Sequence, residues 1–322
     1  MTPPTPVTSP TASAIGAAAR VLGGRASRDE PLAPMTTYRV GGPAALFVRA
    51  RSVEDLLAVA AARRDSGLPV LVVGRGSNLL VADSGFAGIA VSVAELAGDL
   101  AIDVADGRPV ATAGGGLALP VLARRTAALG YTGLEWAVGV PGTVGGAVCM
   151  NAGGHGSDMA ACVVDATVLD LDADDPVARA VPVDHLGLRF RGSDLTGRHV
   201  VLGARLRLDH GDRATAEATI AEIVRWRREH QPGGQNCGSV FVNPVPGEVS
   251  AGSLVDALGL RGFRIGTAWV SEKHANFVQA SEGGSAADVR AVIEAVRARV
   301  ADATGFHLRS EVRLVGFGEE AG

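Results

Sequence analysis

A short glycine loop that directly follows an apolar strand constrains the fold of this chain most. Residues 69–78 read Pro-Val-Leu-Val-Val-Gly-Arg-Gly-Ser-Asn, and the apolar run 70–73 predicts a buried strand. Upstream, Ser52 and Asp55 form the capping-box pattern of a helix. The segment 46–73 therefore predicts a β-α-β unit that delivers the glycine loop at the end of its second strand.

The chemistry of this loop points to an anionic ligand. Glycine has no Cβ, so the backbone can take unusual dihedral angles and its N–H groups can surround anionic oxygens, above all a pyrophosphate. No Gly-Lys-Ser/Thr follows, which argues against a P-loop NTPase, and Leu79 stands where the third glycine of GxGxxG belongs. The same residues also suit an ordinary glycine turn between two strands.

Two further glycine-rich stretches follow, at residues 114–116 and 139–146. The chain has 43 glycines in 322 residues, well above the usual share of about 7%. Each stretch needs a reason to forgo side chains. Three of them within residues 74–146 predict a large dinucleotide lying against bare backbone.

Composition excludes several classes of protein. The net charge of −4 gives no general attraction to nucleic acid or to an anionic membrane, and 4% aromatic residues argue against a base-stacking platform. The cysteines Cys149, Cys162 and Cys237 have no metal-ligand or disulfide spacing. We expect no metal site, no membrane or nucleic-acid partner, and a cytoplasmic location, since no secretory signal is recognisable.

The predicted organisation is α+β. Residues 1–31 are expected to be a disordered or loosely ordered tail, because the first residues are rich in Pro, Thr and Ser. A first domain is expected over 32–212, with subdomains of about 32–95 and 96–212. The charged turn at 210–213 is interpreted as the boundary to a C-terminal domain over 213–322.

Three polar residues lie in segments that suggest chemistry. Ser239 follows a glycine and precedes an apolar pair, so its hydroxyl can be held at a strand start, although a turn serine that bonds its own backbone fits equally. Arg191 lies between an aromatic residue and a glycine and can bind a carboxylate bidentately or remain a surface arginine. Glu311 shares a strand face with Arg313 and is either its partner or directed toward a ligand.

These segments, taken in order, resemble the UDP-N-acetylenolpyruvoylglucosamine reductase family over residues 32–317, in the form that lacks an extra tyrosine-bearing loop. The resemblance implies a vanillyl-alcohol-oxidase (PCMH)-type FAD-binding domain of two α+β subdomains, followed by a C-terminal α+β substrate-binding domain. The motifs that carry it are Thr37-Tyr-Arg-Val-Gly-Gly-Pro43, Gly74-Arg-Gly-Ser-Asn78, Gly139-Val-Pro-Gly-Thr-Val-Gly-Gly146, Asn151-Ala-Gly153, Phe190-Arg-Gly-Ser193, Cys237-Gly-Ser-Val-Phe-Val-Asn-Pro244, Val270-Ser-Glu-Lys-His274 and Glu311-Val-Arg313.

The resemblance also implies the reaction. NADPH reduces FAD, and hydride from the reduced flavin then reaches the vinyl carbon of UDP-N-acetylglucosamine enolpyruvate. Ser239 corresponds to the proton donor, while Arg191 and Glu311 correspond to residues that stabilise the enolate. An ionised Glu311 would repel that enolate, so we expect it to be protonated, with a pKa raised by burial, or bridged by a cation or water.

The resemblance further implies binding residues, and we expect the protein to be a monomer. Cofactor contacts are expected from Tyr38, Gly74, Arg75, Gly76, Ser77, Asn78, Gly115, Gly139, Pro141, Gly142, Thr143, Gly145, Gly146 and Asn151. Substrate contacts are expected from Arg227, His230, Asn243 and Lys273, although the basic residues also suit the solvated face of a helix. Two other functions stay open: another oxidoreductase of the vanillyl-alcohol-oxidase type, and a non-catalytic sugar-nucleotide binder.

Overall fold

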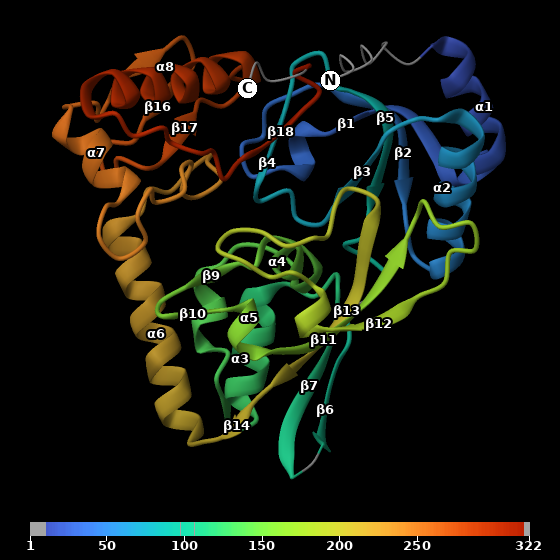
Figure 1. Ribbon diagram of the computed structural model, residues 1–322, viewed down its shortest axis with the longest axis horizontal. Coiled ribbons are helices and arrows are strands. Elements are labelled where there is room, and N and C mark those ends of the chain that lie inside the picture. Colours follow the sequence, from blue (N-terminus) through green and yellow to red (C-terminus); the bar gives the residue numbers. More distant parts are fainter. Residues whose placement is uncertain (1–10, 97, 106, 319–322) are drawn as a thin grey trace.

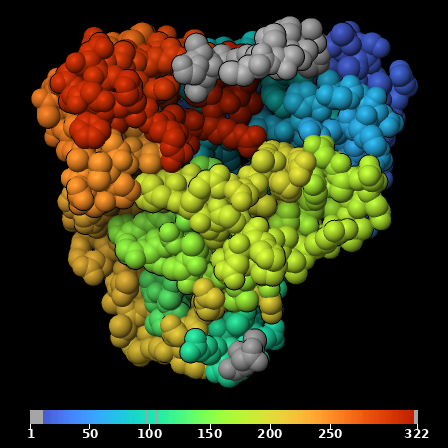
Figure 2. Space-filling model, in the orientation of Figure 1, coloured from blue at the N-terminus to red at the C-terminus, as the bar shows by residue number. Residues whose placement is uncertain are grey.

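The computed structural model describes residues 11–96, 98–105 and 107–318. They form three α+β units (Figure 1), which pack against one another in the space-filling view (Figure 2). Residues of all three units line one cavity. None of the helices within these ranges combines the length and the hydropathy that a bilayer span requires.

The first unit is a four-stranded sheet in the order β1-β2-β5-β3. Strands β2, β5 and β3 are parallel, and β1 is an antiparallel edge. Two helices cover one face, where side chains such as Leu56 and Ile89 form a core. The elements are α1 (Ala12–Leu22), η1 (Gly23–Arg25), β1 (Ala26–Pro31), η2 (Ala33–Met35), β2 (Pro43–Arg49), α2 (Val53–Ser66), β3 (Val70–Val73) and β5 (Phe86–Ser92).

The predicted β-α-β unit is confirmed. Helix α2 begins after Ser52 with the reciprocal capping box, in which the Asp55 side chain accepts from the Ser52 backbone at 3.3 Å. Strand β3 then ends at the residue before Gly74. The glycine loop therefore leaves the sheet at the carboxyl end of a buried parallel strand, as the sequence predicted.

The expected loose tail over 1–31 is wrong for residues 12–31. Thr11 caps α1 by accepting from the Ala14 N–H at 3.2 Å, Ala18 and Leu22 are fully buried, and β1 pairs with β2. The side chains of α1 that pack in this core, Ala14, Ile15, Ala18, Ala19 and Leu22, follow helical spacing, so the Pro-, Thr- and Ser-rich composition of the first residues does not extend to this segment. Residues 1–10 lie outside the described residues.

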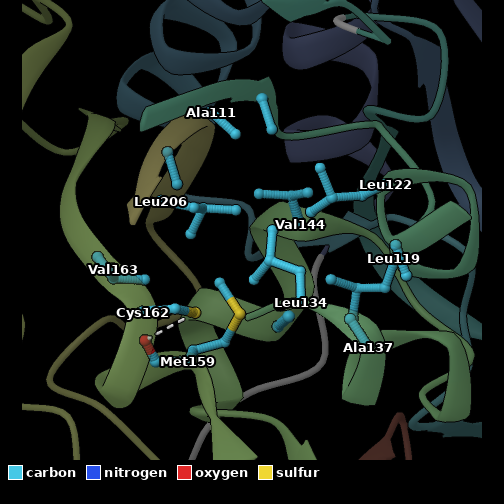
Figure 3. Close-up of a cluster of buried hydrophobic side chains, with 14 of the residues drawn as sticks. Ala111, Leu119, Leu122, Leu134, Ala137, Val144, Met159, Cys162, Val163 and Leu206 are labelled. Atoms are coloured by element: carbon cyan, nitrogen blue, oxygen red, sulfur yellow. Dashed lines mark hydrogen bonds between the residues drawn. The ribbon is translucent and has the colours of Figure 1, made fainter. Parts of the chain in front are cut away.

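The second unit is an antiparallel sheet in the order β12-β11-β13-β7-β6. Its core collects side chains from the sheet and from the helices beside it, including Leu119, Leu134 and Leu206 (Figure 3). The elements are β6 (Leu100–Ala105), β7 (Arg108–Gly114), α3 (Leu119–Ala128), β8 (Tyr131–Thr132), η3 (Glu135–Gly139), α4 (Val144–Met150), β9 (Gly153–Gly154), β10 (Ser157–Asp158), α5 (Met159–Cys162), β11 (Val163–Asp170), β12 (Arg179–Pro182), η4 (Val183–His185), β13 (His199–Arg207) and β14 (Asp209–His210).

Helix α6 (Arg213–His230) corrects the predicted domain boundary. Its buried residues Ala216, Ile220 and Ile223 belong to the core of the second unit, where the helix packs against α3 and η3. The boundary expected at residue 213 assigned α6 to the C-terminal domain, whereas its buried side chains belong to the core of the second unit. The residue spacing reveals a buried helical face, but it does not reveal which neighbour covers that face.

The third unit is a three-stranded antiparallel sheet, β15-β16-β17, covered by α7 and α8. Residues 285–300 carry the signals of a capped amphipathic helix: Ser285 with Asp288 predicts its start, and Val289, Val292, Ile293, Val296 and Val300 recur at helical spacing. The structure confirms both, because the stripe is buried in the third core and the Ser285 hydroxyl accepts from two N–H groups of α8. The elements are α7 (Ala251–Ala257), β15 (Arg264–Ile265), β16 (Ala268–Val270), β17 (Val278–Ala280) and α8 (Ala286–Thr304).

The first and third units are joined directly. Strand β18 (Arg313–Val315) pairs in parallel with β4 (Leu79–Val81), the strand after the glycine loop. The Asp83 carboxylate accepts from the Ala286 N–H at 2.8 Å and the Ala287 N–H at 3.0 Å, so a residue of the first unit caps α8 of the third. Burial raises the pKa of Asp83, but these N–H bonds outweigh it and the pKa lies below its ordinary value.

Candidate active site

A cavity of about 510 Å³ lies where the three units meet. The first unit contributes the loop after β3, the second contributes residues 139–153 and 191–201, and the third contributes Ser239 and Glu311. Its volume is within the usual range for a small-molecule site, roughly 300–1,000 Å³.

The loop 74–78 presents unpaired backbone donors to this cavity. In the described part of the chain, no acceptor meets hydrogen-bond geometry for the N–H groups of Arg75, Gly76, Ser77 and Asn78. Gly76 is in the left-handed region at φ 58°, and a Cβ there would collide with the Met35 carbonyl. The geometry explains why this position requires glycine.

The second glycine loop packs directly on the first. A Cβ on Gly74 would lie 2.8 Å from the Thr143 Oγ1, and the Thr143 hydroxyl caps α4 by accepting from the Gly146 N–H at 3.2 Å. The N–H groups of Gly142 and Thr143 also lack an acceptor among the described residues. Two adjoining loops with free N–H groups are the donor set that suits a pyrophosphate.

Arg191 reaches the cavity from a tight turn in the connection between β12 and β13, which passes over α4 (Figure 1). Arg189 and Gly192 close the turn with mutual backbone hydrogen bonds of 2.9 and 3.0 Å. Arg191 itself has φ 56°, a conformation that costs a non-glycine residue about 1–2 kcal/mol. Such strain is typical of functional sites, and the alternative of a solvated surface arginine is wrong.

Glu311 is the ionic partner of Arg191. The Arg191 Nε donates to the Glu311 Oε1 at 2.9 Å, and the two side chains are only 26% and 17% exposed. The Glu311 carbonyl accepts from the Asn78 side chain at 2.8 Å, which joins the glutamate to the first glycine loop. Pairing with Arg313, the alternative considered from the sequence, is not what the structure shows.

Ser239 lies on the same wall. The next residue, Val240, donates to the Asn276 carbonyl at 2.8 Å and accepts from the Glu311 N–H at 2.7 Å. Among the described residues the Ser239 hydroxyl has no hydrogen-bond partner, so it is not a turn serine that bonds its own backbone. The structure thus brings Ser239, Arg191 and Glu311, which are distant in the sequence, around one cavity.

Burial raises the pKa of the Glu311 carboxyl above its ordinary value of 4.5, and Arg191 offsets this only in part. The direction matches our expectation of a carboxyl group that holds its proton more tightly than usual. A protonated Glu311 can stand beside developing negative charge without repelling it.

The raised pKa makes stability fall as pH rises. The unfolded state loses the Glu311 proton first, so the contribution is fully present below the unfolded pKa and is lost as pH rises through the folded pKa. We expect the free energy of unfolding of Glu311→Gln to gain on wild type as pH rises above the ordinary carboxyl pKa of 4.5, by at most about 1.4 kcal/mol per pH unit. Urea unfolding at a series of pH values measures this, and a constant difference would contradict the raised pKa.

The cavity is positively charged although the protein is not. Its charged wall residues are Arg75, Arg191, Arg227, Arg313 and Glu311. Arg227 donates to the Gly139 carbonyl and, at 2.8 Å, to the Gln231 side chain; burial lowers its pKa. Four guanidinium groups against one carboxyl group indicate ligands that carry several negative charges.

Three residues expected to contact the cofactor lie elsewhere. Tyr38 is fully buried in the core of the third unit, beside Cys237, with burial raising its pKa. Gly115 packs on β13, where a Cβ would collide with the Val201 carbonyl. Asn151 is 3% exposed, and its side chain bonds Arg189, Asp158 and Ala160. Only Asn151 stands in a motif beside cavity residues, Ala152 and Gly153; none of residues 37–43 or 114–116 is on the cavity wall.

Three of the four expected substrate contacts also lie outside the cavity wall. His230 is exposed and stacks on Trp226 with ring centroids 4.7 Å apart. The Asn243 side chain accepts from the Ala251 N–H at 3.1 Å. Lys273 donates to the Arg228 carbonyl. Arg227 is the one that the structure places in the cavity.

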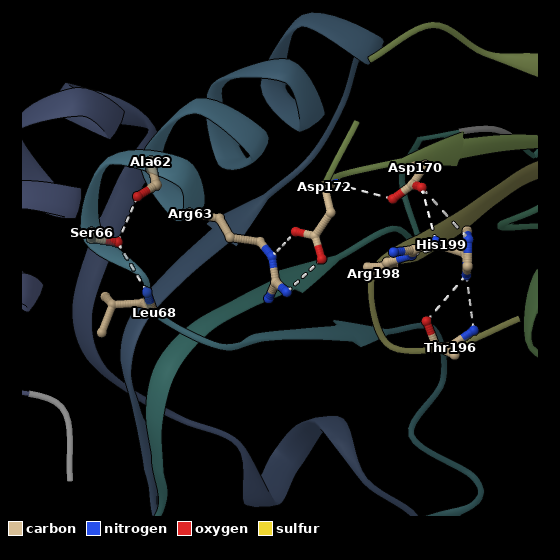
Figure 4. Close-up of polar contacts among 9 residues, drawn as sticks. All are labelled: Ala62, Arg63, Ser66, Leu68, Asp170, Asp172, Thr196, Arg198 and His199. Atoms are coloured by element: carbon tan, nitrogen blue, oxygen red, sulfur yellow. Dashed lines mark hydrogen bonds and ion pairs between the residues drawn. The ribbon is translucent and has the colours of Figure 1, made fainter. Parts of the chain in front are cut away.

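Some cavity residues were missed. Arg313 was interpreted only as a partner of Glu311, and nothing in the sequence identified His199. The His199 Nδ1 accepts from the Thr196 N–H at 2.9 Å and its Nε2 lies 3.8 Å from Asp170 (Figure 4). Burial lowers the pKa of His199, which favours the neutral ring. A lone histidine in a strand carries no pattern that could have revealed this position.

The cysteines are poor candidates for catalysis. Cys149 and Cys237 line the cavity, but burial raises their pKa values to about 11 and about 12. Both thiols therefore stay protonated near neutral pH and are weak nucleophiles. Within the described ranges, no three His, Cys, Asp or Glu side chains are placed to share a metal ion.

Known proteins are similar in sequence to this chain over nearly its whole length. UDP-N-acetylenolpyruvoylglucosamine reductases of Heliobacterium modesticaldum and Synechococcus sp. (strain WH7803) are 43% and 42% identical over 295 and 290 residues. The alignments cover 91% and 89% of this chain and 91% and 92% of those proteins. The chain belongs to the UDP-N-acetylenolpyruvoylglucosamine reductase family.

Domain models and a solved structure agree with this membership. The C-terminal domain model of the reductase family matches residues 230–315, and an FAD binding domain model matches residues 44–174. The crystal structure of the reductase from Thermus caldophilus, 31% identical, superposes with a TM-score of 0.74 and covers 90% of this chain and 99% of its own. The predicted fold class is confirmed, and the cofactor is FAD.

Proposed function

We propose that this protein reduces the enolpyruvyl group of UDP-N-acetylglucosamine enolpyruvate to give UDP-N-acetylmuramate, with NADPH as the source of electrons. One observation carries the proposal: Ser239 and the Arg191–Glu311 pair line the same cavity as two glycine loops with free N–H groups. All of these groups come from one chain, so the reaction requires no second copy.

The glycine loops would hold the FAD pyrophosphate through the N–H groups of residues 75–78 and 142–143. Bound FAD supplies the hydride, which adds to the terminal vinyl carbon. Negative charge then moves onto the substrate carboxylate as an enolate. The Arg191 guanidinium, fixed by its strained turn and largely shielded from water, is suited to stabilise that charge.

Ser239 would complete the reduction by giving its proton to the carbon that bears the carboxylate. A serine hydroxyl is a weak acid, but an enolate is a strong base, so a fixed position can make the transfer efficient. The serine alkoxide then regains a proton from water. Glu311 keeps Arg191 in place and, when protonated, adds no opposing charge.

The proposal includes a cytoplasmic location and NADPH as the reductant. Three free cysteines fit a reducing compartment such as the cytoplasm. The cavity arginines suit the phosphates of NADPH and of a nucleotide diphosphate sugar. Both ligands would enter the same cavity in turn.

An anaerobic titration tests the proposal. Purified protein is expected to be yellow and to lose its visible flavin absorbance on addition of roughly one equivalent of NADPH per flavin, because each NADPH transfers one hydride. The absorbance should return when the enolpyruvyl substrate is added. NADH is titrated in parallel to measure the preference for NADPH.

Other outcomes would favour the other functions. Reoxidation by oxygen but not by the enolpyruvyl substrate would indicate an oxidase of the same fold. Binding of the UDP-sugar without any change in flavin absorbance would indicate a non-catalytic binder.

A further inference from the structure

Three hydrogen bonds fasten the Arg191 turn to the end of helix α4. The Ser193 hydroxyl donates to the Cys149 carbonyl at 2.7 Å, the Asn151 side-chain amide donates to the Arg189 carbonyl at 3.1 Å, and Arg191 Nη2 donates to the Gly153 carbonyl at 3.0 Å. We call these three bonds the clamp. They join Cys149, Asn151 and Gly153 to the residue after the turn, the first residue of the turn and its third residue, respectively.

The turn needs such support because its geometry is unfavourable for arginine. A turn closed by bonds between its first and fourth residues, with a left-handed third residue, ordinarily has glycine or asparagine at that third position. Here the third position is Arg191 at φ 56°. If the ends of the turn were released, the backbone could relax and the guanidinium would move away from Glu311.

The Asn151 side chain is oriented to hold the turn at Arg189. Asn151 ends α4 in the left-handed conformation at φ 40°, which asparagine tolerates. Its side-chain oxygen accepts from the Ala160 N–H at 2.9 Å, which fixes the amide so that its NH₂ group faces the Arg189 carbonyl. The bond to Ala160 therefore orients the Asn151 NH₂ group independently of the turn.

Ser193 is the second fastening point. It is 8% exposed, donates to Cys149 and also accepts from the Leu195 N–H at 3.1 Å. Its hydroxyl is fully used by the protein and is not offered to a ligand. Both residues thus act on the cavity through Arg191.

From this geometry we infer that Asn151 and Ser193 are positioning residues for Arg191, and that they serve the substrate half-reaction without touching substrate. The inference rests on the proposed function of Arg191. Breaking the clamp should slow reoxidation of the reduced flavin by the enolpyruvyl substrate, because that step uses the guanidinium. Reduction of the flavin by NADPH should change little, because it does not.

The experiment is a double-mutant cycle on the FAD-loaded enzyme, with the two half-reactions followed separately by anaerobic stopped flow. Asn151→Asp keeps the acceptor for Ala160 and removes the donor to Arg189. It also removes the donor to the Asp158 carboxylate at 3.3 Å, so the change is made in an Asp158→Asn background, which avoids two facing carboxylates and keeps the Oδ1 acceptor for the Ala161 N–H. We expect it to slow reoxidation by roughly tenfold or more and flavin reduction by less than about twofold. In an Arg191→Ala background the same change should slow reoxidation by less than about twofold, because the residue it positions is gone.

Ser193→Ala is the second variant, and it decides the case if the aspartate variant does not retain FAD. Its matched control is Ser66→Ala at the end of α2 (Figure 4). The Ser66 hydroxyl donates to the Ala62 carbonyl at 2.5 Å and accepts from the Leu68 N–H, two residues further along the chain, at 3.2 Å. We expect slower reoxidation for Ser193→Ala and unchanged half-reactions for the control.

Equal slowing of both half-reactions, or the same factor with and without Arg191, would overturn the inference and leave Asn151 and Ser193 as general supports of the fold. Wild-type enzyme that is not reoxidised by the substrate at all would instead reject the proposed function, and the inference with it.

Discussion

Replacing Ser239 by alanine is expected to slow reoxidation of the reduced flavin by the enolpyruvyl substrate by roughly a hundredfold or more, the usual contribution of a positioned proton donor. Flavin reduction by NADPH should stay within about twofold of wild type, because that step needs no proton from Ser239. The cavity supports this separation, since the Ser239 hydroxyl points to no protein partner among the described residues. Anaerobic stopped flow with each ligand in turn measures the two rates.

A second readout separates the proton donor from a binding role. If Ser239 only helped to hold the substrate, saturating substrate would restore the rate of reoxidation. A lowered limiting rate is the expected result. Equal losses in both half-reactions would reject the role of proton donor.

Replacing Gly76 by alanine is expected to have the largest effect on FAD retention and stability. The added Cβ would collide with the Met35 carbonyl and approach the Thr36 Cα to 2.8 Å, and the residue would keep φ 58°. The left-handed backbone costs about 1–2 kcal/mol, and overpacking adds about 1–3 kcal/mol. We expect urea unfolding to show the sum of both losses, and purified protein to retain little FAD.

Gly67→Ala is the matched control. Gly67 is also left-handed, at φ 69°, but nothing lies within 4 Å of a Cβ built there. It should lose only the cost of the backbone conformation, about 1–2 kcal/mol, and keep its FAD. Similar losses for both variants would show that the close approach at residue 76 contributes nothing.

The local pattern of the sequence identified much of the fold. The β-α-β unit, the cap at Ser285 and the buried stripe of α8 depend on interactions between neighbours in the chain, so residue spacing is enough to predict them. The glycine loops were recognisable for the same reason. Helix α1 was missed because the Pro-, Thr- and Ser-rich composition of the first residues was extended to residues 12–31, where Ile15, Ala18 and Leu22 pack in the first core.

The candidate site was predictable only in part. Resemblance selected Ser239, Arg191 and Glu311, and the structure places all three around one cavity. It also selected Tyr38, Gly115 and Asn151, which support the wall from behind. Which residue of a motif faces the cavity depends on side-chain direction, and that direction is fixed by packing between units.

The sequence by itself therefore determined the β-α-β unit and helix α8, the loops that can bind anions and the family to which the chain belongs. Only the tertiary structure decided that α6 packs in the second core, that Glu311 pairs with Arg191 rather than with Arg313, and that Asn151 holds the Arg191 turn. The physical reason is the range of the interactions. Propensity and glycine geometry act over a few residues, whereas these contacts join segments up to 120 residues apart, and their partners exist only once the chain has folded.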